Sequence, residues 1–133
     1  MLSEKDSPHR HFFSKQERLC SKKAIVFLLK QKSLFVYPFK CYFHFLKKTE
    51  NQDITKICIT VPKHRFKLAV DRNRIKRQTR EAYRLNKEIL YSDARMSDWV
   101  GELLFVYIGK EKPTYLQIEK SMVSLLTQLE RKR

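Results

Sequence analysis

The residues best suited to chemistry are basic and recur at every fourth position in the middle of the chain. The row is Arg72, Lys76, Arg80 and Arg84, broadened by Asn73, Arg77 and Lys87. Positions four apart lie on the same side of an α-helix, so a helix here would carry one basic face. A guanidinium group binds two phosphate oxygens at once, and its plane can stack on a base. The spacing therefore predicts a helix that binds a polyanion.

A basic helix face can also be an ordinary solvated surface that is neutralised by its own salt bridges. Arg77 can pair with Glu81, four residues further on. Arg84 can pair with Glu88 in the same way. The cations left without an acidic residue at helical spacing further along are Arg72, Arg74, Lys76 and Arg80. Polyanion binding is therefore the favoured interpretation.

The composition agrees with an anionic partner. The 133 residues carry a formal net charge of +15 and are 42% hydrophobic, which suits one folded domain with a modest core. Such a surplus of like charge is tolerated where a polyanion neutralises it, and nucleic acid is the commonest one. The basic residues are concentrated in the segment 63–87 rather than on an amphipathic terminal helix, which argues against a membrane surface.

Several other classes of protein are disfavoured. Gly101 and Gly109 lie in no glycine-rich phosphate loop, and the acidic residues form no cluster suited to metal-dependent hydrolysis. We therefore expect no active site and no metal ligands in the protein itself, and we read His9 and His11 as part of a solvated tail. The three cysteines are widely spaced, so we expect reduced thiols. The apolar runs are too short to span a bilayer and no secretory signal is visible, which predicts a cytoplasmic protein.

Hydrophobic periodicity predicts seven elements in the order α-β-β-β-α-β-α. Helices are expected over 22–31, 68–91 and from 115 to about 130, and strands over 34–37, 39–46, 54–61 and 102–108. Ser21 is the expected cap of the first helix, and Thr114 with Gln117 forms a capping box for the last. The expected fold is an α+β sandwich, with a flexible basic arm over residues 1–17 and a single domain over 18–133.

The apolar stripes of the helices give the expected core. They are Ile25, Leu28 and Leu29 in the first helix, Ile75, Ala82, Leu85 and Ile89 in the second, and Ile118, Met122, Leu125 and Leu129 in the third. In the second strand, Cys41, Phe43 and Phe45 are expected on one face and Tyr42, His44 and Leu46 on the other. The basic face of the middle helix would then lie away from the sheet.

The middle helix also carries a motif that resembles a known family. The segment Phe66-x-x-Ala69-x-x-Arg72-Asn73-Arg74-Ile75-Lys76-Arg77-x-Thr79-Arg80 is similar to the RNR signature of the bacterial ribonuclease P protein subunit. Residues 13–19 resemble the basic segment that precedes the family's first helix, and the order of elements is also that of the family. The resemblance implies a mixed four-stranded sheet in which the crossover through the RNR helix is left-handed, an exception to the usual rule.

The resemblance also implies a role. Proteins of this family bind a large catalytic RNA, and the two together cut the 5′ leader from precursor tRNA. The RNA performs the hydrolysis with Mg2+ that it mainly holds itself, and no cofactor is bound tightly by the protein. The implied partners are thus the ribonuclease P RNA and precursor tRNA, with neither a membrane nor DNA involved.

The motif assigns residues to two sites. Those implied to bind the catalytic RNA are Lys63, Arg65, Lys67, Arg72, Asn73, Arg74, Lys76, Arg77 and Arg80. Those implied to contact the leader, in a cleft between the first helix and the sheet, are Ile25, Leu29, Tyr42 and His44. Ile25 and Leu29 occupy positions at which the family often has phenylalanine.

Two alternatives share the basic helix. A ribosomal or other RNA-scaffolding protein would have the same charge but no cleft for a single strand beside the sheet. A DNA-binding protein would insert the basic helix into a major groove, but such helices normally come with a helix-turn-helix or a zipper. Here a strand ending at Pro62 precedes the helix, and no heptads follow.

Overall fold

The computed structural model describes residues 15–19, 21–50, 54–91 and 99–132, and its element order is the predicted one. The elements are η2 (Lys15–Glu17), α1 (Lys22–Leu28), β1 (Ser33–Val36), β2 (Phe39–Lys47), β3 (Lys56–Thr60), α2 (Ala69–Asn86), η3 (Lys87–Tyr91), β4 (Trp99–Tyr107) and α3 (Tyr115–Lys132). Both η elements are 3-10 helices. The expectations for His9, His11 and Cys20 lie outside the described residues, as does most of the expected arm.

The strands form one mixed four-stranded sheet in the order β1-β2-β4-β3. β2 pairs antiparallel with both β1 and β4, whereas β3 pairs parallel with β4. The parallel pair requires a crossover connection, and α2 provides it. β4 therefore lies in the interior of the sheet, with its side chains directed alternately to the two faces.

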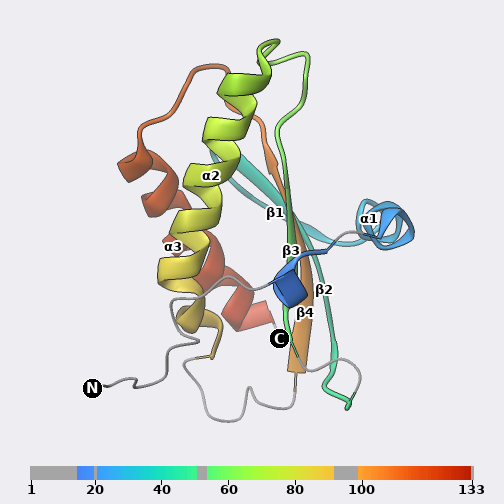
Figure 1. Cartoon of the computed structure of the whole chain (residues 1–133). Helices are drawn as coiled ribbons and strands as arrows, with labels where there is room; N and C mark the ends of the chain where they lie inside the picture. The colour runs from blue at the N-terminus through green and yellow to red at the C-terminus, as the bar shows by residue number, and fades with distance from the viewer. Residues whose placement is uncertain (1–14, 20, 51–53, 92–98, 133) are drawn as a thin grey trace.

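The helices cover the two faces unequally. α2 and α3 pack side by side on one face, and α1 lies alone against the other (Figure 1). The larger cluster of buried side chains fills the space between the sheet and the helix pair, whereas the smaller one, built around Leu19, Leu28 and Leu104, lies under α1. The face toward α1 is consequently only partly covered.

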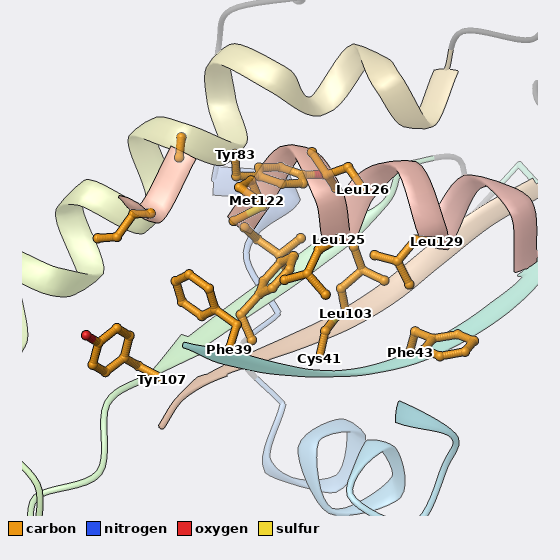
Figure 2. Close-up of a cluster of buried hydrophobic side chains, with 14 of the residues drawn as sticks. Phe39, Cys41, Phe43, Tyr83, Leu103, Tyr107, Met122, Leu125, Leu126 and Leu129 are labelled. Atoms are coloured by element: carbon orange, nitrogen blue, oxygen red, sulfur yellow. The ribbon is translucent and has the colours of Figure 1, made fainter. Parts of the chain in front are cut away.

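The main core confirms most of the predicted stripes. Alternate residues of β2 and β4 point toward α3, as Cys41 and Leu103 do in Figure 2. The four stripe residues of α3 are completely buried: Ile118, Met122, Leu125 and Leu129. Ile75 and Ala82 of α2 are buried as predicted, and Tyr83 joins them. Cys41 and Cys58 are free thiols on β2 and β3, and burial raises the pKa of the Cys41 thiol.

Both predicted caps are present. The Ser21 hydroxyl accepts a hydrogen bond from the Ala24 amide at 3.3 Å. Thr114 accepts from the Gln117 amide at 3.2 Å, and the Gln117 side chain accepts from the Thr114 amide at 3.0 Å. These reciprocal bonds satisfy amides that a helix start leaves without a partner, which is why the box marks the start of α3.

The prediction for α1 was wrong at its end. The helix stops at Leu28 rather than near residue 31, because Lys30 and Gln31 donate to carbonyls three residues back and so tighten the last turn. Leu28 is completely buried, but Leu29 is 49% exposed. Leu29 therefore does not belong to the apolar face that packs on the sheet. The helix expected over 68–91 likewise ends at Asn86 and continues as η3.

The packing of α3 makes a direct prediction about stability. Replacing the completely buried Leu125 by alanine removes core contacts and leaves a cavity, so we expect Leu125→Ala to lower the free energy of unfolding by about 2–5 kcal/mol. Leu116 on the same helix is 75% exposed, and Leu116→Ala should cost no more than about 0.5 kcal/mol. Urea unfolding of both variants checks this, and equal losses would contradict the assigned face of α3.

Candidate nucleic-acid interface

The loop between β3 and α2 is held by one aromatic anchor and one arginine. The Phe66 ring is buried, with its centroid 5.8 Å from that of Tyr107. The Arg72 guanidinium donates hydrogen bonds to the backbone carbonyls of Phe66 at 2.7 Å and Lys67 at 2.9 Å. Arg72 thus braces the loop from the first turn of α2, where no side chain caps the helix. Among the predicted RNA-binding residues, Arg72 therefore also stabilises the fold of the loop.

The remaining predicted basic residues are accessible to a partner. Phe66 points inward, and its neighbour Lys67 is exposed, as is Lys63 at the start of the loop. On α2, Asn73, Arg74 and Arg77 are exposed, and Lys76 and Arg80 are half-buried. Arg74 is two residues from both Arg72 and Lys76, so it projects from a different side of the helix. The other predicted residues of α2 lie on one side of the helix, which we call the basic flank: Arg72, Asn73, Lys76, Arg77 and Arg80.

Carboxylates near α2 are already engaged by other cations. Glu81 accepts two hydrogen bonds from Arg84, at 2.6 and 2.9 Å, instead of pairing with Arg77. The hydrogen bond from Arg84 holds the pKa of the Glu81 carboxyl below its usual value. Asp71, in the first turn of α2, pairs with Lys112 at 3.1 Å. These pairs leave Arg77 and Arg80 without neutralisation from these two carboxylates.

Lys87, which the sequence placed on the basic face, is instead a buried structural residue. Its ammonium group donates to both carboxylate oxygens of Glu17, at 2.9 and 3.0 Å, and both side chains are almost completely buried. Glu17 comes from η2 and Lys87 begins η3, so this ion pair ties the segment before α1 to the segment that follows α2. Lys15–Glu17, the last residues of the expected arm, therefore pack on the domain.

Positive charge is concentrated around Arg80 of α2. Burial lowers the pKa of the Arg80 guanidinium, and the like charges of Arg18 and Arg77 lower it further. Both effects disfavour the positive charge of the Arg80 guanidinium. An anion bound beside Arg80 would therefore stabilise that charge. Arg18 was not among the predicted site residues. The sequence offers no signal for it, because its proximity to Arg80 arises only when η2 packs beside β3.

The expected cleft residues lie on the opposite face of the sheet. Ile25 and Tyr42 are half-buried at the edge of the small core under α1, and the Lys40 ammonium lies 5.0 Å from the centre of the Tyr42 ring. The His44 ring meets the Phe27 ring edge-on, with centroids 5.0 Å apart. α1 thus does supply an aromatic side chain beside the sheet, from a position the sequence analysis did not select. Phe27 is 42% exposed, and it is the one aromatic residue of α1.

The described part of the chain shows neither a metal site nor a membrane-spanning helix. Among the described residues, no three His, Cys, Asp or Glu side chains are grouped so that they could hold a metal ion. In the same part of the chain, no helix is both long and apolar enough to cross a bilayer.

A basic flank on one side of a mixed sheet, and aromatic side chains of α1 and β2 in contact on the other, define a small cationic α+β protein suited to an anionic partner. The family model described as Ribonuclease P matches residues 13–130. A ribonuclease P protein component from Porphyromonas gingivalis is 32% identical over 124 residues, covering 92% of this chain and 90% of the relative. The chain therefore belongs to the family of bacterial ribonuclease P protein components, the protein part of a ribonucleoprotein endoribonuclease of tRNA processing.

Solved structures agree on the fold. The ribonuclease P protein of Staphylococcus aureus superimposes with a TM-score of 0.66 at 22% identity, covering 85% of this chain and 94% of that one. The protein from Thermotoga maritima gives the same TM-score and identity, covering 84% of this chain and 96% of its own. These likenesses confirm the α+β fold with its mixed four-stranded sheet.

The two roles on α2 can be separated by stability. Arg72→Ala removes both bonds to the loop carbonyls, so we expect it to lower the free energy of unfolding by about 1–3 kcal/mol. Lys76→Ala, one turn further along the same flank, should change it by no more than about 0.5 kcal/mol. Urea titrations of the two purified variants measure the difference. If both unfold at the same urea concentration, Arg72 does not brace the loop.

Proposed function

We propose that this chain is the subunit of ribonuclease P that binds the enzyme's catalytic RNA through the basic flank of α2 and the preceding loop. The observation that carries the proposal is the row of cations on α2, where Arg77 is exposed, Arg80 is half-buried and the nearby carboxylate of Glu81 pairs with Arg84 instead. RNA phosphates would supply the missing negative charge and release condensed counterions. The contact set comprises Lys63, Arg65, Lys67, Arg72, Asn73, Arg74, Lys76, Arg77 and Arg80.

The second part of the proposal concerns the 5′ leader of precursor tRNA. A single strand exposes its bases, and bases stack on aromatic side chains. Tyr42 and His44 of β2 and Phe27 of α1 offer ring surfaces on this face, and Ile25 and the exposed Leu29 would add apolar side chains. The Lys40 ammonium above the Tyr42 ring adds a cation for a leader phosphate. The leader would therefore run between α1 and the sheet, on the face away from the basic flank.

In this proposal the protein binds and orients, and the RNA performs the hydrolysis. Mg2+ prefers oxygen ligands such as grouped carboxylates. The carboxylates of Glu17, Asp71 and Glu81 are each paired with a cation instead. In the assembled enzyme Mg2+ would then be held mainly by the RNA. We expect the protein to take part in this cleavage in the cytoplasm.

The proposal is tested with the assembled enzyme. The purified protein is mixed with the ribonuclease P RNA of its own organism and a leader-bearing precursor tRNA at low Mg2+ concentration. We expect cleavage at the mature 5′ end to be faster than with the RNA alone. Arg77→Glu reverses an exposed charge on the basic flank and should reduce the stimulation by about tenfold or more.

Lys120→Glu makes the same change of charge at an exposed position on α3 and should leave most of the stimulation intact. A protein that binds the RNA without accelerating cleavage would instead be a scaffolding protein. That outcome would refute the proposed function.

The cleft is tested with a second pair of variants. Tyr42→Leu keeps an apolar side chain but removes the ring, so binding of a leader-bearing precursor should weaken by about tenfold. Binding of mature tRNA, which has no leader, should be unchanged. Tyr37→Leu alters a ring that is 61% exposed near the end of β1 and should affect neither substrate. Equal losses on precursor and mature tRNA would count against a leader contact by Tyr42.

A further inference from the structure

The sheet face toward α1 carries a row of three ionisable side chains on three neighbouring strands. Glu102 on β4 is directly opposite His44 on β2 and directly opposite Lys56 on β3. Residues paired in this way project from the same face with their Cβ atoms roughly 5 Å apart. The carboxylate of Glu102 thus stands beside His44, which already contacts Phe27 of α1.

Glu102 also lines a shallow hollow that is open to solvent. The lining residues are Leu46, Ile54, Lys56, Val100, Gly101 and Glu102. Three of these residues come from the beginning of β4. Its wall thus combines three apolar side chains with one carboxylate and one ammonium group. A nucleobase has the matching chemistry, with apolar faces and a polar edge.

The carboxylate of Glu102 has no partner of its own in the described ranges of the chain. Elsewhere in those ranges, Glu17, Asp71 and Glu81 each accept from a cation at hydrogen-bond or ion-pair distance. Neither Lys56 nor His44 closes on Glu102 in this way, although both are its neighbours in the sheet. A half-buried acceptor thus remains available to a ligand.

Such an acid is unexpected in the binding face of a chain with a net charge of +15. An ionised carboxylate repels phosphate and can only accept hydrogen bonds. A single strand crossing this face would therefore direct a base edge, rather than its backbone, toward Glu102. Lys56 on the adjacent strand reduces the repulsion and can accompany a phosphate at the rim of the hollow.

The position of Glu102 is rigid enough for discrimination. It lies in the interior strand of the sheet, and the preceding amide of Gly101 donates to the Thr55 hydroxyl at 3.1 Å. Gly101 is packed so closely that a Cβ there would lie 2.9 Å from the Phe45 ring. A side chain on such a strand holds its acceptor atoms in place better than one on a loop does.

We propose that Glu102 is a specificity-determining residue that accepts hydrogen bonds from the N–H edge of one leader base, with guanine preferred. This inference rests on the proposed function. Guanine presents two neighbouring donors, N1–H and the N2 amino group, which match the two oxygens of a carboxylate. Adenine and cytosine present one amino group beside an acceptor. Uracil presents N3–H between two carbonyl oxygens, which the carboxylate repels.

The experiment compares many leaders in one tube. The holoenzyme cleaves a pool of precursor tRNAs with a randomised leader at low Mg2+ concentration, and sequencing of the remaining precursor gives relative kcat/KM values. With the unaltered protein we expect guanine to be favoured over uracil by about tenfold at one leader position. Glu102→Gln, which has the same shape but carries an amide donor, should abolish most of that preference. Glu102→Ala, which removes the acceptor altogether, should do the same.

A matched control separates base recognition from charge. Glu111→Gln removes the same charge from an exposed residue beyond the other end of β4, so it should raise binding of all leaders equally and keep the guanine preference. Urea unfolding of each variant checks that the fold is intact. An unchanged preference in both Glu102 variants, or no guanine preference with the unaltered protein, would overturn the inference.

The result also distinguishes the inference from the function on which it rests. If the unaltered protein accelerates all members of the pool equally, the proposed function stands and the role of Glu102 is wrong. If it accelerates none of them, the proposed function itself fails.

Discussion

The rest of the structure depends on which side of α2 faces the core. Ile75, Ala82 and Tyr83 are buried against the sheet and α3, and this packing fixes which side chains the helix presents to solvent. Arg77 and Arg80 then lie where Arg18 adds to their charge. The apolar contacts thus hold like charges together, at an electrostatic cost that an RNA backbone would remove.

The sheet connects the two proposed binding surfaces because its strands alternate. In β2 and β4, one set of residues builds the core under α2 and α3, and the intervening set faces α1. Phe43 is buried in the core while its neighbours Tyr42 and His44 lie on the side of α1. A shift of register by one residue would exchange the two sets, so the core that stabilises the domain also fixes which side chains face α1.

The acidic residues of this basic protein differ in whether they pair with a cation of the chain itself. Glu17 and Glu81 bind cations of the chain itself, and so hold η2 in place and neutralise Arg84. Glu102 has no such task in the described structure and is flanked on both neighbouring strands by groups that do not pair with it. This difference is the physical basis for assigning it to the recognition of a base rather than to stability.

The sequence by itself determined the features that depend on residues close along the chain. Helical periodicity and the capping box located α3 and its four buried residues, and four-residue spacing located the basic row of α2. Tertiary structure alone decided that Lys87 binds Glu17, that Arg18 approaches Arg80, and that Phe27 rather than Leu29 approaches the sheet. Glu17 and Lys87 are 70 residues apart, and a spacing of three or four residues reports only on one helix. Contacts between distant segments depend on how the elements pack, and local patterns contain no information about that packing.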